Sequence, residues 1–386
     1  MAKAKEPKEE KQEKGAASQL KKYFENHKED HYNFEPDYSY RVKSGSLILD
    51  SEVSMGPGVA RFIGSTSGGK TSCTLAYMKN FLADSEYGHN RVGVYFKSEG
   101  RLGEEMQERS GIEFFKDPRA LEEGDPFGKC FIIESNVYEF NFGLVRDLIT
   151  DNPNNTQYFF VFDSADAMGR REDLAKPLEK ADQVAGGALI TSVFLKKAAL
   201  ALAKRGHIAV FISQNRQAFS ATPYTPQADR QGKASGGLSV QHYTDLALEF
   251  LRRSKDDIIY DDSPQLTKTK GKKILGHWCK VKVWKSNNEK YQTELTYPIR
   301  YGRKDGKSVW QEYEITDTLL MFEQIKRSGG WFNFSDLFRQ DLLDAGFDEG
   351  DVPEKLQGID KVRDFFRDNE KIREYVYQKL LTLIGD

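Results

Sequence analysis

One segment constrains the fold of this chain more than any other: Gly64-Ser65-Thr66-Ser67-Gly68-Gly69-Lys70-Thr71. An apolar run, residues 59–63, precedes it, and a stretch compatible with a helix, beginning Ser72-Cys73-Thr74, follows it. A strand, a glycine-rich turn and a helix in this order are the setting in which the pattern G-x-x-x-x-G-K-[ST] cradles phosphate. A glycine-rich turn that contains Lys-Thr by coincidence is the alternative, and the flanking patterns argue against it.

The chemistry of such a segment follows from its residue types. Glycines let successive backbone N–H groups point inward and form an anion-binding nest, and the start of the helix adds its positive end. Lys70 then reaches the β- and γ-phosphates, while the hydroxyl of Thr71 ligates Mg²⁺. The residues from Gly64 to Ser72 are therefore predicted to bind ATP together with Mg²⁺.

Composition limits the class of protein. A chain of 386 residues with 38% hydrophobic and 30% charged residues can form one large α/β domain with a smaller satellite. Its three cysteines are scattered, which argues against a disulfide framework or a zinc site and suits a reducing compartment. No apolar run approaches the roughly 20 residues of a membrane span, so we expect no membrane partner and a cytoplasmic location.

The chain divides into four expected parts. Residues 1–16 are rich in Lys, Glu and Ala and are predicted to be a disordered tail. Residues 17–43 are predicted to hold a short amphipathic helix around 19–27 and an arm that packs on its own domain or contacts a neighbouring subunit. Residues 44–330 form the expected core, and residues 331–386 a small helical C-terminal domain.

Within the core, apolar runs alternate with helical patterns. Strands are predicted at 91–96, 130–133, 158–162 and 208–212, and helices at 103–111, 141–151 and 188–203. This alternation predicts an α/β fold with a mainly parallel twisted sheet and helices on both faces. From Leu246 the runs alternate more and are joined by polar turns, which predicts an antiparallel extension with strands near 246–251, 278–284 and 294–299.

Polar side chains follow several of these strands, at the edge where a doubly wound sheet binds its ligands. Asp163 follows 158–162 as a Walker B carboxylate would, and is predicted to hold Mg²⁺; a helix N-cap is the alternative role. Glu99 could polarise the water that attacks the γ-phosphate, although a Glu at a strand end is often only a solvated charge. Gln214 could sense the γ-phosphate.

Two stretches without periodicity leave the same edge. Residues 216–235 are long for a loop inside a compact domain and combine cations with flat rings, as a single-strand site does. A solvated surface loop is the alternative. The second stretch, residues 169–183, would face the first. The cations and rings of residues 216–235 are Arg216, Phe219, Tyr224, Arg230 and Lys233.

The order of these motifs resembles the RecA recombinase family, and most closely its bacteriophage UvsX-type branch, over roughly residues 44–330. The resemblance rests on an ordered set: Ser44-Gly45-Ser46-Leu47, Gly64–Thr71, Ser98-Glu99, Phe162-Asp163-Ser164, Ile212-Ser213-Gln214-Asn215-Arg216, Gly236-Gly237 and Lys280-Val281-Lys282-Val283-Trp284-Lys285-Ser286. The phosphate loop alone is generic, whereas the set is much more specific.

The resemblance implies a RecA-like P-loop ATPase core and roles for single residues. Glu99 matches the family's catalytic glutamate, and Gln214 matches the glutamine that couples the ATP state to the second DNA-binding loop. The resemblance implies that residues 169–183 and 216–235 are the two DNA-binding loops, which adds Arg170, Arg171, Gly236 and Gly237 to the candidate DNA-binding residues. Lys285 aligns with a lysine that acts across the subunit interface on a neighbour's γ-phosphate. Two positions depart from the pattern: Lys97 stands where relatives commonly carry an acid, and Asn287 replaces what is often a second basic residue.

The expected function is that of a DNA-dependent ATPase that forms helical filaments on single-stranded DNA and promotes homologous pairing and strand exchange with duplex DNA. A loader and a single-strand-binding protein are the expected further partners, and a phage origin would place it in the host cytoplasm. A hexameric DnaB-like helicase and a KaiC-like ATP switch remain the alternatives, and the long loop ending in Gly236-Gly237 favours the filament.

Overall fold

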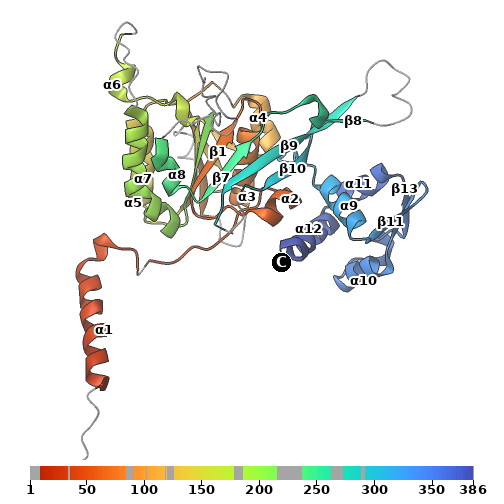
Figure 1. Cartoon of the computed structure of the whole chain (residues 1–386), viewed down its shortest axis with the longest axis horizontal. Helices are drawn as coiled ribbons and strands as arrows, with labels where there is room; N and C mark the ends of the chain where they lie inside the picture. The colour runs from red at the N-terminus through yellow and green to blue at the C-terminus, as the bar shows by residue number, and fades with distance from the viewer. Residues whose placement is uncertain are drawn as a thin grey trace, which may run out of the picture.

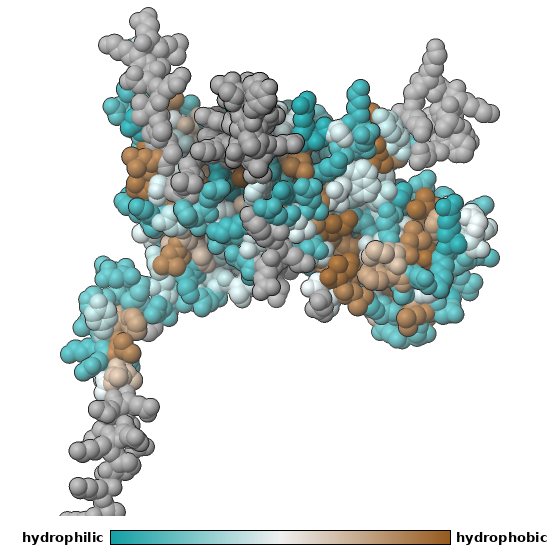
Figure 2. Space-filling view, viewed as in Figure 1, coloured by the Kyte–Doolittle hydropathy of each residue, from teal (hydrophilic) through white to brown (hydrophobic). Residues whose placement is uncertain are grey.

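The computed structural model describes most of the chain: residues 9–33, 35–83, 90–100, 102–117, 119, 126–177, 186–214, 237–261, 273–287 and 292–385. Its centre is a large sheet with helices on both faces, and a smaller body lies at the C-terminal end (Figure 1). Exposed apolar side chains lie in separated patches on the face in view, over α1, near α5 and α7, and on the smaller body (Figure 2). None of the described helices combines the length and apolar character that crossing a bilayer requires.

The large sheet has ten strands in the order β10-β9-β7-β1-β6-β5-β2-β4-β3, with β8 paired to β9. Their bounds are β1 Gly58–Gly64, β2 Arg91–Lys97, β3 Phe114–Phe115, β4 Cys130–Ile133, β5 Gln157–Asp163, β6 Ile208–Gln214, β7 Leu246–Phe250, β8 Ile258–Tyr260, β9 Ile274–Lys285 and β10 Glu294–Arg300. The strands from β7 to β3 along this order run parallel. The predicted fold class is thereby confirmed.

The antiparallel extension begins one strand later than the sequence indicated. Strand β7 pairs parallel with β1 and antiparallel with β9, and β9 is in turn antiparallel to β10 and β8. Leu246 begins the last parallel strand before the edge, and the direction reverses only between β7 and β9.

The helices of the core cover both faces of the sheet. Their bounds are α2 Leu47–Glu52, α3 Lys70–Ala83, α4 Glu104–Ser110, α5 Tyr138–Thr150, α6 Arg171–Leu174, α7 Gly186–Lys204, α8 Gly237–Tyr243 and α9 Gln311–Met321. Helix α3 packs with one face of the sheet, where Phe81 contacts Phe159, and α5 and α7 pack with the other. Successive side chains of a strand point to opposite faces of the sheet. Phe159 of β5 therefore packs on the side of α3, whereas Phe160 packs on the side of α5 and α7.

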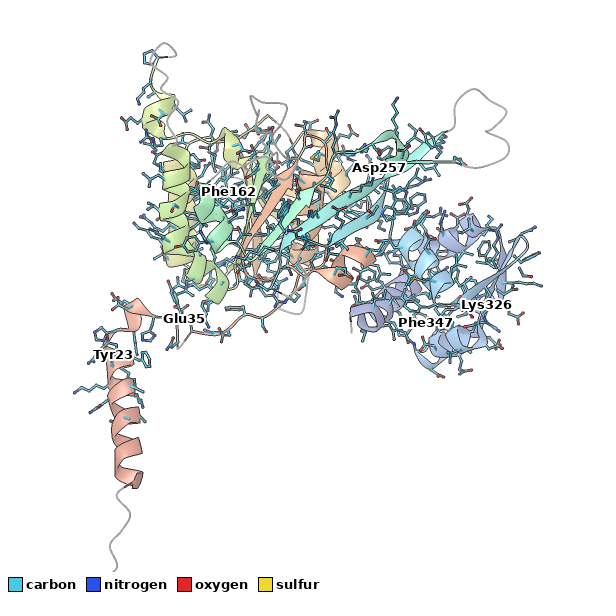
Figure 3. All side chains as sticks on the ribbon, viewed as in Figure 1. Tyr23, Glu35, Phe162, Asp257, Lys326 and Phe347 are labelled. Carbon is cyan, nitrogen blue, oxygen red and sulfur yellow. The ribbon has the colours of Figure 1, made fainter. Side chains whose placement is uncertain are left out.

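A stack of three aromatic rings crosses the sheet just below its carboxyl edge. Phe162, labelled in Figure 3, lies between Phe96 of β2 and Phe211 of β6, with ring centroids 4.8 and 4.6 Å away. All three side chains are buried. Aromatic pairs contribute about 0.5–1.5 kcal/mol beyond their buried area, so this stack fixes how the ends of β2, β5 and β6 are spaced.

The N-terminal part differs from the expectation in the length of its helix. Helix α1 spans Glu9–Asn26, so it begins inside the segment that the sequence marked as a tail, and it stands away from the body (Figure 1). The arm that follows packs on its own core: Glu35 pairs with Arg205 at 2.9 Å, and the hydroxyl of Tyr40 donates to the carbonyl of Gly206 at 2.7 Å.

The C-terminal body contains a sheet that the sequence analysis omitted. Its elements are β11 Ile325–Ser328, β12 Trp331–Phe334, α10 Asp336–Asp344, β13 Lys355–Gln357, α11 Ile359–Asp368 and α12 Glu370–Gly385. The strands are only three or four residues long, which is too short for a periodicity signal, and the first lies before Gly329-Gly330. The helices α9 to α12 and this sheet share one apolar core that also includes Leu47 of α2.

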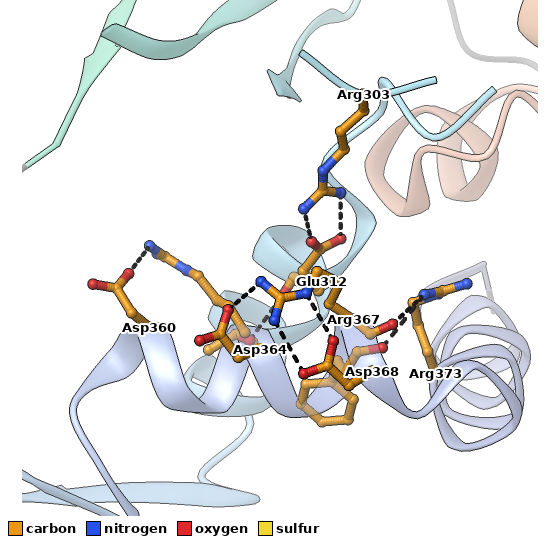
Figure 4. Close-up of polar contacts among 10 residues, drawn as sticks. Arg303, Glu312, Asp360, Asp364, Arg367, Asp368 and Arg373 are labelled. Carbon is orange, nitrogen blue, oxygen red and sulfur yellow. Dashed lines mark hydrogen bonds and ion pairs between the residues drawn. The ribbon is translucent and has the colours of Figure 1, made fainter. Parts of the chain in front are cut away.

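The ion pairs in and next to this body differ in how exposed they are (Figure 4). Arg367 pairs with Asp364 at 2.5 Å and with Asp368 at 2.8 Å, but these groups are 38–63% exposed, and exposed pairs contribute little to stability. The guanidinium of Arg303, in contrast, donates two hydrogen bonds to Glu312, whose side chain is only 4% exposed. This pair fastens the turn after β10 to α9.

The buried carboxylate of Glu314 links α2 to α9. Ser46 caps α2 by accepting the amide of Leu49 at 3.1 Å and donates its own hydrogen bond to Glu314 of α9 at 2.6 Å. Glu314 also accepts the amide of Leu47 at 3.0 Å. Burial raises the pKa of Glu314 from 4.5 to about 8, against the lowering effect of these hydrogen bonds.

This raised pKa predicts a pH-dependent stability. The folded chain binds a proton at Glu314 more tightly than the unfolded chain, so the free energy of unfolding falls as the pH rises from about 4.5 to about 8. Replacing Glu314 with Gln should remove this fall, which at 1.36 kcal/mol per pH unit amounts to at most about 4 kcal/mol between pH 5 and pH 8. Urea unfolding at several pH values measures it.

The control is Glu323→Gln, because Glu323 lies on the surface, where its side chain is 75% exposed. This variant should keep the pH dependence of the wild-type chain. A Glu314→Gln variant with the wild-type slope would contradict the assignment.

Candidate nucleotide site

The loop between β1 and α3 has a backbone that only glycine permits at two positions. Gly64 has φ 143° and Gly69 has φ 109°, both in the region that favours glycine. A Cβ at Gly64 would lie 2.2 Å from the carbonyl oxygen of Phe250, and one at Gly69 would lie 3.1 Å from the Sγ of Cys279. The glycines thus let the loop press against β7 and β9 while its other side stays open.

Helix α3 begins at Lys70, directly after this loop. The amide of Cys73 donates to the carbonyl of Gly69 at 2.9 Å, which places residues 70–72 in the first turn of α3, the part of a helix that attracts anions. The Nζ of Lys70 donates to the carbonyls of Gly64 and Ser65, each at 2.8 Å, and the side chain is 6% exposed. The predicted segment from Gly64 to Ser72 therefore has the geometry of a phosphate cradle.

Asp163, the last residue of β5, lies beside the start of α3. Its Oδ2 accepts hydrogen bonds from the Oγ1 of Thr71 at 2.8 Å and from the hydroxyl of Tyr95, and Asp163 is 2% exposed. A hydroxyl and a carboxylate in contact are hard oxygen ligands of the kind that Mg²⁺ takes, with the remaining positions filled by phosphate and water. These two residues fit the ion.

Glu99, which follows β2, and Gln214, which ends β6, meet in space. The Nε2 of Gln214 donates to the Oε1 of Glu99 at 3.3 Å, and the Oγ of Ser164 donates to the same oxygen. The amides of Ser98 and Glu99 both donate to the carbonyl of Asp163, at 2.9 and 3.2 Å. Three strand-end residues that the sequence singled out are thus within one hydrogen-bonded group.

Asp166 belongs to this group and was missed. It lies in the short 3₁₀ helix η3, Ala165–Ala167, and its Oδ2 accepts the amide of Gln214 at 2.5 Å. Arg61, buried in the middle of β1, interacts with Asp166; burial lowers the pKa of Arg61 and the carboxylate opposes that shift. The arginine inside the apolar run 59–63 was the one available signal, because a buried cation needs an anionic partner.

Lys285 does not reach the phosphate loop of its own chain. It ends β9 opposite Ala247, whereas Val281 is opposite Phe250, and Phe250 is opposite Gly64. The register therefore places Lys285 near the amino end of β7, level with the middle of β1, and its Nζ donates to the carbonyls of Gln241 and His242 at 3.4 and 3.3 Å. The role across a subunit interface stays a prediction.

The candidate DNA-binding residues are only partly described. Arg170 pairs with Asp173 at 2.5 Å, and Arg171 begins α6, with its amide donating to Glu139 at 2.9 Å. Gly237 begins α8. The others lie outside the described residues: Arg216, Phe219, Tyr224, Arg230, Lys233 and Gly236.

A cavity of about 640 Å³ adjoins the phosphate loop, on the side of β9 and β10. Apolar side chains such as Leu102 and Met106 line it together with Arg253 and Tyr301. Arg253 donates to the hydroxyl of Tyr301 at 2.9 Å and to the carbonyl of Ser67 at 3.3 Å. Its size suits a small-molecule ligand, and the sequence did not reveal it because segments far apart in the sequence form its walls.

Comparison with known proteins agrees with this geometry. No family model matches the chain. The protein RecA of Macrococcus caseolyticus is 23% identical over 356 residues, which cover 89% of this chain and 82% of that protein. RecA of Bifidobacterium breve is 24% identical over 349 residues, with 89% and 74% covered, and RecA of Staphylococcus aureus is 22% identical over 357 residues, with 89% and 83% covered.

Each of these three matches covers 89% of the chain. Over that length, the chain is similar to bacterial RecA proteins.

Proposed function

We propose that this protein is an ATP-dependent DNA recombinase that assembles into helical filaments on single-stranded DNA and promotes homologous pairing and strand exchange with duplex DNA. Support comes from the similarity to RecA proteins along 89% of the chain and from the ordered motifs at the carboxyl edge of the sheet. The finer assignment to the bacteriophage UvsX-type branch, with a host-cell cytoplasmic location, a loader and a single-strand-binding partner, belongs to the same proposal.

One contact carries the proposal: the hydrogen bond of 3.3 Å from Gln214 to Glu99. Glu99 is placed to polarise a water, and Gln214 is the last described residue before the segment 215–236, to which most of the candidate DNA-binding residues belong. Gln214 contacts Glu99 and directly precedes the segment 215–236. It can therefore couple hydrolysis to DNA binding, because a change at Glu99 or in the segment alters the same hydrogen bond.

The side chains have distinct tasks in this scheme. Amides from Gly64 to Ser72 bind the phosphates, and Lys70 exchanges its loop carbonyls for β- and γ-phosphate oxygens. Thr71 and Asp163 would hold Mg²⁺, which neutralises charge between the β- and γ-phosphates when bound. Glu99 accepts a hydrogen bond from the attacking water and orients it. ATP and Mg²⁺ are the proposed cofactors.

A filament is proposed because Lys285, one of the predicted catalytic residues, lies away from the phosphate loop of its own chain. Lys285 lies away from its own Gly64, so a role on a γ-phosphate requires the phosphate of a neighbouring subunit. A cation supplied by a neighbour stabilises charge that spreads over the γ-phosphate oxygens in the transition state. Hydrolysis would then depend on assembly.

Replacing Lys70 with Ala should lower the ATPase rate at least 100-fold and prevent assembly on single-stranded DNA, because the γ-phosphate loses its buried cation. Lys79→Ala is the matched control: Lys79 lies on the same helix, but its Nζ donates to the carbonyl of Asp305 at 2.5 Å. Phosphate release with and without DNA measures both. Full DNA-dependent activity in Lys70→Ala would refute the scheme.

Replacing Glu99 with Gln should reduce kcat by about 10²- to 10⁴-fold while nucleotide affinity changes little, because the amide keeps the size but cannot act as a base. Glu134→Gln is the control, since Glu134 follows the adjacent strand β4 and pairs with Lys97 at 2.9 Å on the surface. Single-turnover hydrolysis separates the chemical step from binding. Equal rates for the two variants would remove Glu99 from its proposed role.

The function itself is tested by electron microscopy with ATP and single-stranded DNA, together with Gln214→Ala. We expect helical filaments from the wild-type chain, and a variant that binds nucleotide but loses the stimulation of ATPase by DNA. Closed rings would indicate a DnaB-like helicase, and no assembly with no DNA stimulation would indicate an ATP switch. Either result would overturn the recombinase proposal.

A further inference from the structure

Tyr95 is a buried phenol whose position in the sheet no apolar requirement explains. It lies in β2, opposite Ile132 of β4 and Val161 of β5, and it is fully buried in the core shared with α3. A phenylalanine would fill this place with the same ring and without a polar atom. A buried hydroxyl needs a hydrogen-bond partner, because leaving it unpaired costs about 1–3 kcal/mol.

The partner of this hydroxyl is the carboxylate at the centre of the candidate site. Tyr95 donates to the Oδ2 of Asp163, the oxygen that also accepts from Thr71 at 2.8 Å. The phenol is the donor of this hydrogen bond, because an ionised carboxylate oxygen can only accept.

We propose that Tyr95 is a positioning residue for the divalent cation: its hydroxyl fixes the orientation of the Asp163 carboxylate toward Thr71. The inference rests on the proposed Mg²⁺ and ATP site. The aromatic ring is held by the sheet and α3, so the hydroxyl is a rigid point, whereas the Asp163 side chain alone could rotate about its two χ angles. Together, Tyr95 and Thr71 fix one carboxylate oxygen from two sides.

Two effects of this hydrogen bond oppose each other. Sharing a lone pair with the phenol makes the carboxylate a weaker electrostatic partner for the cation, whereas fixing its orientation removes the entropy cost of ordering it. Partners that orient metal ligands typically change metal affinity or activity by 10- to 100-fold in the favourable direction. Orientation is therefore the larger effect, and the loss of Tyr95 should weaken the binding of Mg²⁺.

The experiment is a titration of Mg²⁺ at a fixed concentration of a non-hydrolysable ATP analogue. Its readout is the melting temperature of the full chain at each Mg²⁺ concentration. Tyr95→Phe should raise the half-saturating Mg²⁺ concentration about tenfold. Its affinity for the analogue in excess EDTA should equal that of the wild-type chain. A merely structural role would lower the melting temperature at every Mg²⁺ concentration without moving the midpoint.

Tyr138→Phe is the matched control. The hydroxyl of Tyr138 is also buried nearby, but it donates to the carbonyl of Ala165 at 2.9 Å rather than to Asp163. This variant loses one buried hydrogen bond of the same kind and should keep the wild-type Mg²⁺ midpoint. An equal shift in the two variants, or no shift in Tyr95→Phe, would overturn the inference.

A double-mutant cycle keeps the inference testable even where Tyr95→Phe is destabilised. In an Asp163→Asn background, Tyr95→Phe should leave the Mg²⁺ midpoint unchanged, because the carboxylate that it orients is gone. A further tenfold shift in that background would refute the inference. A wild-type chain that shows no Mg²⁺-dependent stabilisation by nucleotide would instead refute the proposed function, so the two failures are distinguishable.

Discussion

Asp163 connects three parts of the carboxyl edge that lie far apart in the sequence. Its carbonyl accepts the amides of Ser98 and Glu99, and its carboxylate accepts the hydroxyls of Thr71 and Tyr95. The end of β2, the end of β5 and the start of α3 are therefore fastened to one residue. A buried carboxylate is costly unless it is fully hydrogen-bonded, so these contacts have to be kept together.

The apolar layer beneath makes this arrangement possible. Phe162 precedes Asp163 in β5 and stacks between Phe96 and Phe211, whose strands end in the other polar residues of the site. Close-packed rings resist small displacements because an interior has few voids into which they can move. The packed rings therefore also limit the movement of Glu99 and Gln214 at the strand ends, whose side chains form a hydrogen bond of 3.3 Å.

The sequence predicted features that depend on residues close together in the chain, and it missed those that depend on residues far apart in it. The strand, loop and helix around Lys70 and the residues at strand ends are local patterns, and the resulting parallel sheet is confirmed. Tyr95 meets Asp163 across 68 positions and Ser46 meets Glu314 across 268, and neither pair has a local signature. The short strands β11 to β13 and the parallel direction of β7 were missed because neighbouring strands, rather than periodicity, decide them.

The charges at this edge bear on the proposal that a second subunit contributes to the chemistry. Glu99, Asp163 and Asp166 bring three carboxylates close to the place where a triphosphate would add more negative charge. Arg61 is buried beneath them in β1, and Lys70 is the cation of the loop itself. Coulomb repulsion in such a setting has to be offset by Mg²⁺ and by a further cation. Lys285 lies away from its own loop, and the proposed scheme therefore takes that cation from a neighbouring chain.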